Sequence, residues 1–212
     1  MFSLNLSSLL KSINHIFITL IPKVHNLERV SEFRPISLYN MIYKIVSKVI
    51  ANHLKPLLNF IISETQSAFT ANRQIIDNIL ISFESLHYMK TNCSRKKGFM
   101  ALKLDMSKAY DKVEWIFLEI ILLKLGFQDS WVALIMECIT TVSCSILVNG
   151  EPKSMITASR GLRQGDPLSP FLFLFYVEGL NALFRKAPAE GEIQGFSICR
   201  NDPKLTHLFF CK

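Results

Sequence analysis

Two hydrophobic periods alternate along the chain and predict a mixture of strands and helices. Residues Ile13–Pro22 are apolar and largely β-branched, which favours an extended segment that ends at the proline. From Ser37 to Ile62, apolar residues recur at the spacing of one helix face, and Pro56 is expected to kink or split that helix. The same spacing predicts a second helix over Ile75–Lys90.

The central region adds a short apolar segment and a further helix. Phe99–Asp105 is mostly apolar and predicts a buried strand. A helix is expected over Lys112–Leu125, with Gly126 as its stop signal. Asp111 and Glu114 have the spacing of a capping box, so Asp111 is expected to start this helix.

The last third predicts a hairpin followed by a long apolar helix. Two β-rich segments, Ser143–Val148 and Lys153–Ala158, flank Asn149-Gly150, a pair that favours a tight turn between antiparallel strands. Residues Pro167–Ala187 then predict a strongly apolar helix, with Asp166 as its N-cap. Strands interleaved with helices indicate an α+β or α/β fold.

Composition and charge narrow the class of protein. Half of the 212 residues are hydrophobic and 19% are charged, so the chain has enough apolar surface for a packed core. A net charge of +7 favours an anionic partner, either nucleic acid or a membrane surface. Lys44, Lys48 and Lys55 form a stripe that would suit a solvated helix face or a contact with such a partner.

The cysteines and the hydropathy of the chain indicate the cellular environment to expect. The five cysteines include no Cys-x-x-Cys pair, so we expect neither a zinc site nor a disulfide framework. No long apolar run is present, and the apolar start lacks the basic residues of a signal peptide. We therefore expect an intracellular protein, cytoplasmic or nuclear, with no membrane partner.

Two stretches carry candidate chemistry. Asp105 ends the expected buried strand and Asp111 follows six residues later. A carboxylate at a strand end is a common way to hold a divalent cation, although such residues also serve as turn or cap residues. Residues 160–167 place two glycines and two arginines before a helix N-terminus, which suits a phosphate or nucleotide as well as an ordinary capped loop.

Together these stretches resemble the reverse transcriptase domain of non-LTR (LINE-type) retrotransposons, most closely those of plants. The motifs that carry the resemblance are Ile21-Pro22-Lys23, Phe33-Arg34-Pro35-Ile36-Ser37-Leu38, Gln66-Ser67-Ala68-Phe69, Gly98 to Asp105, Leu147 to Pro152 and Arg160 to Pro170. The resemblance implies an α+β right-hand polymerase fold, with fingers over about 1–98, an incomplete palm over about 99–212, and no thumb. It also implies an RNA template, a DNA primer and deoxynucleoside triphosphates as partners.

The resemblance assigns roles to individual residues. Asp105 corresponds to the first catalytic carboxylate, which binds Mg²⁺, and Tyr110 to the aromatic residue beneath the incoming sugar. Gln164 and Gly165 correspond to the pair that contacts the incoming nucleotide and the template. Arg34 and Lys23 are candidates for triphosphate or template contacts, although Lys23 is also consistent with an ordinary surface charge. Arg73 corresponds to the arginine of a fingers motif and is a further nucleotide-binding candidate. At Arg73 the family usually has Pro-Gly-Arg, and Ala71-Asn72 stands here instead, so the shape of that loop is open.

The sequence departs from the family at the second carboxylate motif. The family places Phe/Tyr-Ala-Asp-Asp on a hairpin after the Gln-Gly pair, whereas here Leu205–Phe210 is followed by Cys211-Lys212. Two-metal phosphoryl transfer needs carboxylates from more than one strand, so the sequence predicts an inactive polymerase domain. Two alternatives to a working polymerase stay open, namely a nucleic-acid-binding remnant and the product of a pseudogene that does not fold stably.

Overall fold

The chain folds into two compact units. A computed structural model describes residues 13–26, 28–70, 72–91, 98–197 and 204–209. The first unit comprises Met1–Leu54 and Lys108–Tyr176, and the second comprises Lys55–Ser107 and Val177–Lys212. Each unit is therefore discontinuous in sequence.

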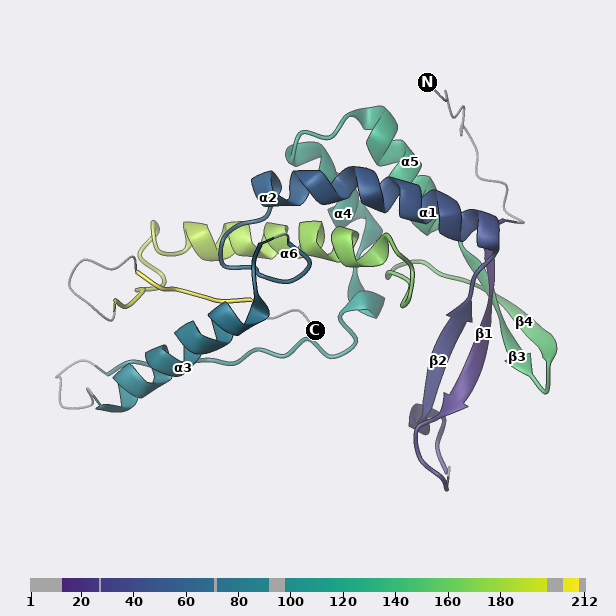
Figure 1. The fold of residues 1–212 in the computed structure, drawn as a ribbon, viewed down its shortest axis with the longest axis horizontal. Coiled ribbons are helices and arrows are strands. Elements are labelled where there is room, and N and C mark those ends of the chain that lie inside the picture. The colour runs from purple at the N-terminus through teal and green to yellow at the C-terminus, as the bar shows by residue number, and fades with distance from the viewer. Residues whose placement is uncertain (1–12, 27, 71, 92–97, 198–203, 210–212) are drawn as a thin grey trace. The chain divides into compact units, whose positions relative to one another are not determined.

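A four-stranded sheet belongs to the first unit (Figure 1). Its strands are β1 (His15–Pro22), β2 (Phe33–Leu38), β3 (Ser143–Val148) and β4 (Glu151–Thr157), in the order β2-β1-β3-β4. The central pair β1–β3 is parallel, whereas β1–β2 and β3–β4 are antiparallel. The predicted strand and hairpin are both confirmed.

The turn between β3 and β4 explains why the hairpin was predictable. Asn149 and Gly150 have φ angles of 52° and 81°, so both central residues of the turn are left-handed. A two-residue turn with this backbone matches the twist of the flanking strands, and Asn and Gly are the residues that tolerate it. The local sequence is therefore sufficient to specify this turn.

Strand β2 corrects the prediction of a helix from Ser37. The strand continues to Leu38 and helix α1 (Met41–Leu54) begins only after it. Pro35 lies within β2 opposite Leu20, and β2 is an edge strand, where a missing N–H costs no ladder hydrogen bond on the open side. Pairing with β1, which the local pattern does not encode, determines the conformation.

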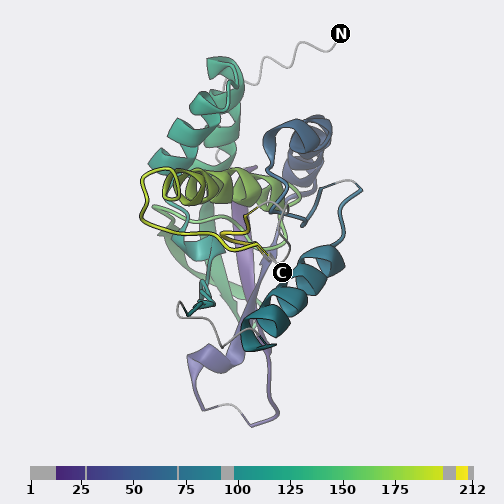
Figure 2. The same cartoon turned by 90° about the vertical axis from the view of Figure 1, so that its left-hand side faces the viewer.

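Helices of the first unit pack around an apolar core. Besides α1 they are α4 (Trp115–Lys124), α5 (Asp129–Thr140) and the first part of α6 (Ser169–Lys186), and α4 and α5 lie side by side (Figure 2). Short 3₁₀ turns occupy Val30–Glu32 and Tyr110–Lys112. The largest fully buried side chains of this unit are Tyr43, Leu54, Val113, Leu118, Leu122, Ile135, Leu168, Leu172, Leu174 and Phe175.

The start of α4 corrects the predicted capping box. Its N-cap is Glu114, which makes no capping hydrogen bond through its side chain, and Asp111 lies in the preceding 3₁₀ turn. Backbone bonds from Gly161 and Leu162 hold that turn in place, so a contact distant in sequence overrides the local motif. The predicted end holds, because Gly126 follows α4 with a φ of 89°.

The second unit is mainly helical. It contains the 3₁₀ turn Lys55–Leu57, α2 (Leu58–Ile61), α3 (Ile75–Thr91) and the last part of α6, so the predicted helix break at Pro56 is confirmed. Isolated bridges join Gln66 to Phe209 and Phe196 to Leu205. Among the helices that the structure describes, none is both long and apolar enough to cross a bilayer.

The predicted buried strand Phe99–Asp105 is wrong. These residues form no strand ladder and are exposed, with Leu102 73% and Leu104 69% accessible. A strand is stable only when a neighbour satisfies its backbone groups, and the described residues place no strand beside this segment. An apolar run alone therefore did not specify a strand.

Candidate nucleotide site

The candidate site is the turn Arg163–Asp166, which lies in the first unit. Its two middle residues, Gln164 and Gly165, are exposed, and Gly165 has a φ of 89°. The phenol of Tyr39 donates a 2.8 Å hydrogen bond to the carbonyl of Gln164. The turn thus presents the Gln164 side chain and a bare stretch of backbone to solvent.

A buried ion pair lies beneath this exposed pair. Arg163 Nη2 is 3.5 Å from Asp166 Oδ2, and the two side chains are only 9% and 1% exposed. The Asp166 carboxylate also accepts hydrogen bonds from the hydroxyls of Tyr43 and Ser47 and from the backbone N–H of Leu168. Helix α6 begins at Ser169 rather than at Pro167, so the prediction of Asp166 as its N-cap is wrong, and the bond from Leu168 instead closes the turn that precedes the helix.

Arg163 is held by partners from both sequence segments of the first unit. Its guanidinium donates to Asn14 Oδ1 at 2.6 Å and to the Cys138 carbonyl at 2.7 Å, and it lies 4.0 Å from the ring centre of Tyr43. Asn14 is itself fully buried and donates to Cys138 and to Thr141. A buried charge is tolerated only when it is paired and hydrogen-bonded, and Arg163 satisfies both conditions.

The surrounding ionisable groups stay neutral. Burial, reinforced by the Asp166 charge, raises the pKa of Tyr39 to about 12 and raises the pKa of Tyr43 still further. Burial likewise raises the pKa of the Cys138 thiol to about 12. Both tyrosines are therefore constant hydrogen-bond donors across the physiological pH range.

Close backbone packing joins the site to Tyr110. Gly161 donates to the Val113 carbonyl at 2.7 Å, and Leu162 donates to the Tyr110 carbonyl at 2.8 Å. Gly161 has a φ of 92°, and a Cβ placed there would lie 3.2 Å from the backbone of Asp111 and Tyr110. Glycine relieves both the tight contact and the left-handed backbone, and this close approach holds Tyr110 next to the segment that leads to Arg163.

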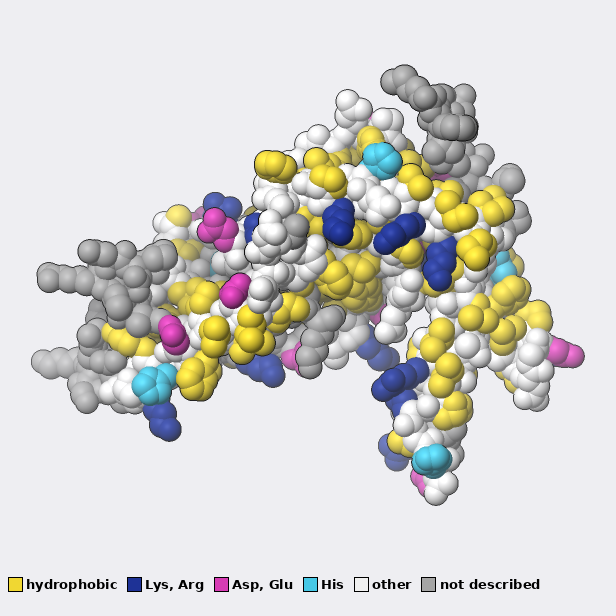
Figure 3. Space-filling model, in the orientation of Figure 1, with side chains coloured by type: hydrophobic (Ala, Val, Ile, Leu, Met, Phe, Trp, Pro, Cys, Tyr) yellow, Lys and Arg dark blue, Asp and Glu magenta, His cyan; other side chains and the backbone are white. Residues whose placement is uncertain are grey.

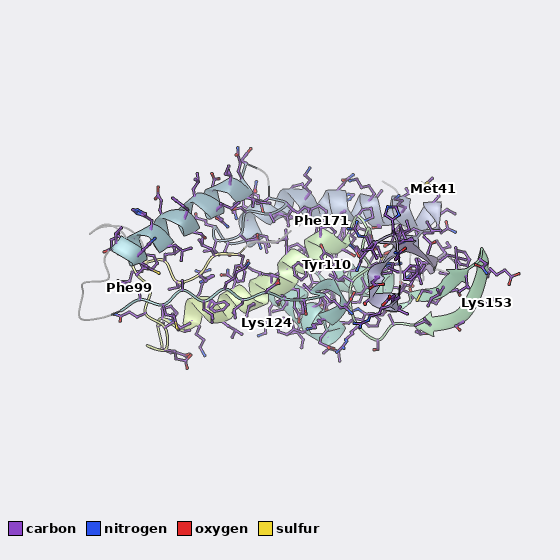
Figure 4. All side chains as sticks on the ribbon, turned by 90° about the horizontal axis from the view of Figure 1, so that it is seen from below. Met41, Phe99, Tyr110, Lys124, Lys153 and Phe171 are labelled. Carbon is purple, nitrogen blue, oxygen red and sulfur yellow. The ribbon has the colours of Figure 1, made fainter. Side chains whose placement is uncertain are left out.

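Tyr110 is half-buried against α6. Its ring stacks on Phe173 with a centroid distance of 5.0 Å and an interplanar angle of 15°. Figure 4 labels Tyr110 beside the first half of α6, near Phe171. The structure therefore brings Tyr110, Gln164 and Gly165 together in one unit.

Two other basic candidates lie in this unit, and the first, Arg34, is exposed on β2 opposite Ile21. Lys23 is also exposed, and its ammonium donates to the Ser31 carbonyl at 2.9 Å. Figure 3 shows Lys and Arg side chains along α1, where Lys44 and Lys48 are exposed as the sequence predicted. These cations belong to the surface and not to the buried network.

Asp105 and Arg73 belong to the second unit. Asp105 is exposed on the segment that forms no strand. Nowhere in the described part of the chain do three His, Cys, Asp or Glu side chains gather closely enough to hold a metal ion. The residues described therefore do not fit the Mg²⁺ site that the resemblance implies.

Arg73 instead stabilises its own loop. Its guanidinium donates to the carbonyls of Ser63, Gln66 and Ile62, at 2.6, 2.9 and 3.0 Å. Asn72 before it has a φ of 62°. Asparagine tolerates this left-handed backbone better than most residues, so it adopts the conformation for which glycine is normally chosen.

The supporting residues Asn14, Tyr43 and Ser47 were not predicted from the sequence. One signal was available, because Tyr39, Tyr43 and Ser47 recur every four residues and so place three hydroxyls on one side of a helix and its entry. Asn14 gave no such signal, since its partner Arg163 lies 149 residues away.

Comparison with known proteins identifies the family. The profile described as "Reverse transcriptase (RNA-dependent DNA polymerase)" matches residues 21–210, almost the whole chain. The chain belongs to the reverse transcriptase family. The match includes both Asp105 and the Arg163–Asp166 turn.

Similar proteins come from transposable elements. The chain is 32% identical, over 80% of its length, to the "Transposon TX1 uncharacterized 149 kDa protein" of Xenopus laevis. It is 28% identical, over 82% of its length, to the Pol polyprotein of the type-1 retrotransposable element R2 of Popillia japonica. An uncharacterized mitochondrial protein of Arabidopsis thaliana is 47% identical over 30% of the chain.

These relatives confirm the predicted class, a reverse transcriptase domain of the non-LTR retrotransposon type. The chain spans 13% of the frog protein, 24% of the beetle polyprotein and 52% of the Arabidopsis protein. The fold agrees at the level of a mixed α and β domain with a four-stranded sheet.

Proposed function

We propose that this reverse transcriptase domain binds a primer–template and an incoming deoxynucleotide through the Arg163–Asp166 turn. The observation that carries the proposal is the exposed Gln164–Gly165 pair on a fully buried, ion-paired base, within a chain matched to the family over residues 21–210. In this proposal the fingers extend to about residue 98 and palm residues follow.

The proposed contacts follow from chemistry and exposure. Gln164 can donate and accept hydrogen bonds at a base or sugar edge, and Gly165 lets a nucleotide approach the backbone closely. Tyr110 offers the edge of a ring that is stacked on Phe173. Arg34 is the exposed cation proposed to contact phosphate.

We further propose that the chain does not polymerise by itself. A second, converging carboxylate is what the chemistry requires, and the described residues offer no three-ligand group around Asp105. This leaves binding without catalysis as the function that the residues support best. Arg73, whose guanidinium is engaged with its own loop, is proposed to act on nucleotide only through the shape of that loop.

The test measures binding and synthesis on the same protein. Fluorescence anisotropy with a poly(rA)–oligo(dT) duplex should show saturable binding that weakens as salt rises, because phosphate contacts release counterions. Gln164→Ala and Arg34→Ala should each weaken it, and Arg34→Ala should also lower the salt slope by about one. The control Lys153→Ala removes a cation that is paired with Glu151 at 2.7 Å on β4, and should leave the affinity unchanged.

Two results would contradict the proposal. If the protein binds the duplex but no site variant weakens that binding, the Gln164–Gly165 turn is not the binding site. Extension of the oligo(dT) primer with Mg²⁺ and dTTP, abolished by Asp105→Asn, would show that the chain is an active polymerase. Absence of extension together with variant-sensitive binding is the expected outcome.

A further inference from the structure

Three hydroxyl groups from one stretch of chain hold the Arg163–Asp166 turn. Tyr39 donates to the carbonyl of Gln164, and Tyr43 donates to Asp166 Oδ2 at 2.7 Å. Ser47 donates to the other oxygen of the same carboxylate. Their spacing of four residues at the entry and first turns of α1 brings all three to one side.

Each hydroxyl restrains a different part of the turn. Tyr43 bridges the ion pair, because its oxygen also accepts from Arg163 Nη2. With both flanking side chains fixed inward, Gln164 and Gly165 are the only residues of the turn left exposed. Tyr39 then fixes the one carbonyl between them, next to a glycine whose backbone would otherwise be the most mobile of the turn.

We infer that Tyr39, Tyr43 and Ser47 are positioning residues that pre-order the Gln164–Gly165 pair for its ligand. This inference rests on the proposed function for the identity of that ligand, a primer–template with its deoxynucleotide. A turn that is ordered before binding loses less conformational entropy when the ligand arrives, so the three hydroxyls raise affinity without touching it. Since the pKa of Tyr39 is about 12, the effect is constant over neutral pH.

Hydrogen–deuterium exchange of the free protein tests the positioning directly. In Tyr39→Phe and Tyr43→Phe, exchange at Leu168 and Ser169, whose N–H groups donate to Asp166 at the end of the turn, should accelerate about fivefold, the effect of one lost hydrogen bond on local opening. Ser47→Ala should act in the same direction. Tyr39 is only part-buried, so Tyr39→Phe keeps the test valid if a core variant unfolds.

Matched controls separate local ordering from general destabilisation. Ile135→Val removes one methyl group from the core of the same unit. Tyr176→Phe removes a hydroxyl group from a ring that packs against Phe117. Neither should accelerate exchange at the turn selectively, and both should keep the affinity for poly(rA)–oligo(dT) with dTTP.

The outcomes distinguish this inference from the proposed function. Faster exchange at the turn with binding weakened about fivefold supports both. Faster exchange in a protein whose wild type binds no primer–template would contradict the proposed function and, with it, the ligand assigned to the turn, while the positioning of the turn itself would stand. Unchanged exchange in Tyr39→Phe and Tyr43→Phe, or a change equal to that in Ile135→Val, would overturn the inference even if the wild type binds.

Discussion

Arg163→Met should destabilise the first unit by roughly 3–5 kcal/mol, the usual cost of removing one partner from a buried ion pair. The Asp166 side chain is 1% exposed, so its charge cannot be hydrated when the guanidinium is removed. At the same time, Asn14 and the Cys138 carbonyl lose a hydrogen-bond donor, and the ring of Tyr43 loses the cation that lies over it. Methionine keeps the apolar stem, so the change isolates the loss of charge and hydrogen bonds.

Tryptophan fluorescence provides an assay specific to this unit. The two tryptophans of the chain, Trp115 and Trp131, both lie in the first unit. Urea unfolding followed at their emission therefore reports the stability of that unit alone. With Asp166→Asn and the double variant, the same assay completes a double-mutant cycle, in which we expect a coupling free energy of about 2 kcal/mol between the two residues.

The matched control is Arg160→Met. Arg160 pairs with Glu114 at 3.2 Å, but both side chains are more than half exposed, so the expected change is within about 0.5 kcal/mol. Equal effects of Arg160→Met and Arg163→Met would refute the reasoning. So would strict additivity of the Arg163 and Asp166 variants, to within about 0.5 kcal/mol.

Three further predictions concern glycine, cysteine and histidine positions. Gly161→Ala should lower the stability of the first unit in the same urea assay by about 1 kcal/mol more than Gly126→Ala, because both φ angles are positive but only Gly161 faces backbone at 3.2 Å. The thiol of Cys138, with a pKa near 12, should resist iodoacetamide at pH 8 until the protein unfolds, as mass spectrometry of the labelled peptide would show, and early labelling would contradict the burial. Burial lowers the pKa of His207 below its ordinary 6.5, so its contribution to the stability of the second unit is full above 6.5 and is lost as pH falls from 6.5 through the lowered pKa of the folded state. Protection factors of second-unit peptides, which correct the exchange rates for the intrinsic rate at each pH, should therefore fall with acid in the wild type and less in His207→Gln.

Local signals predicted the parts of the fold that short-range geometry determines. The Asn149-Gly150 turn, the break at Pro56 and the helix stop at Gly126 each depend on the φ preference of one or two residues. Phe99–Asp105 and β2 were wrongly predicted because strand formation depends on a partner elsewhere in the chain. Ser37 was predicted to start a helix, yet pairing with β1 makes it part of a strand.

The candidate site likewise contains residues that a local pattern indicates and residues that only contacts distant in sequence bring together. The stretch around Gln164 and Gly165 stood out in the sequence because a glycine-rich, basic segment before a helix is a local pattern, and the family resemblance singled out these two residues within it. The residues that hold them in place come from positions 120 to 149 residues away, as with Tyr43 and Asn14, and single-sequence reasoning has no access to such pairs. The Asp111–Glu114 motif failed for a related reason, since Gly161 and Leu162 hold the turn before α4.

The parallel pairing of β1 with β3 has a consequence for how the protein is made. His15 and Ser143 are 128 residues apart, and the whole of Lys55–Ser107, which belongs to the other unit, is synthesised between them. At ~5–20 residues per second, β1 and β2 wait for several seconds on the ribosome as a two-stranded hairpin before β3 arrives. An isolated hairpin is marginally stable, so the sheet is completed late, and nascent chains shorter than about 150 residues should expose β1 to chaperones.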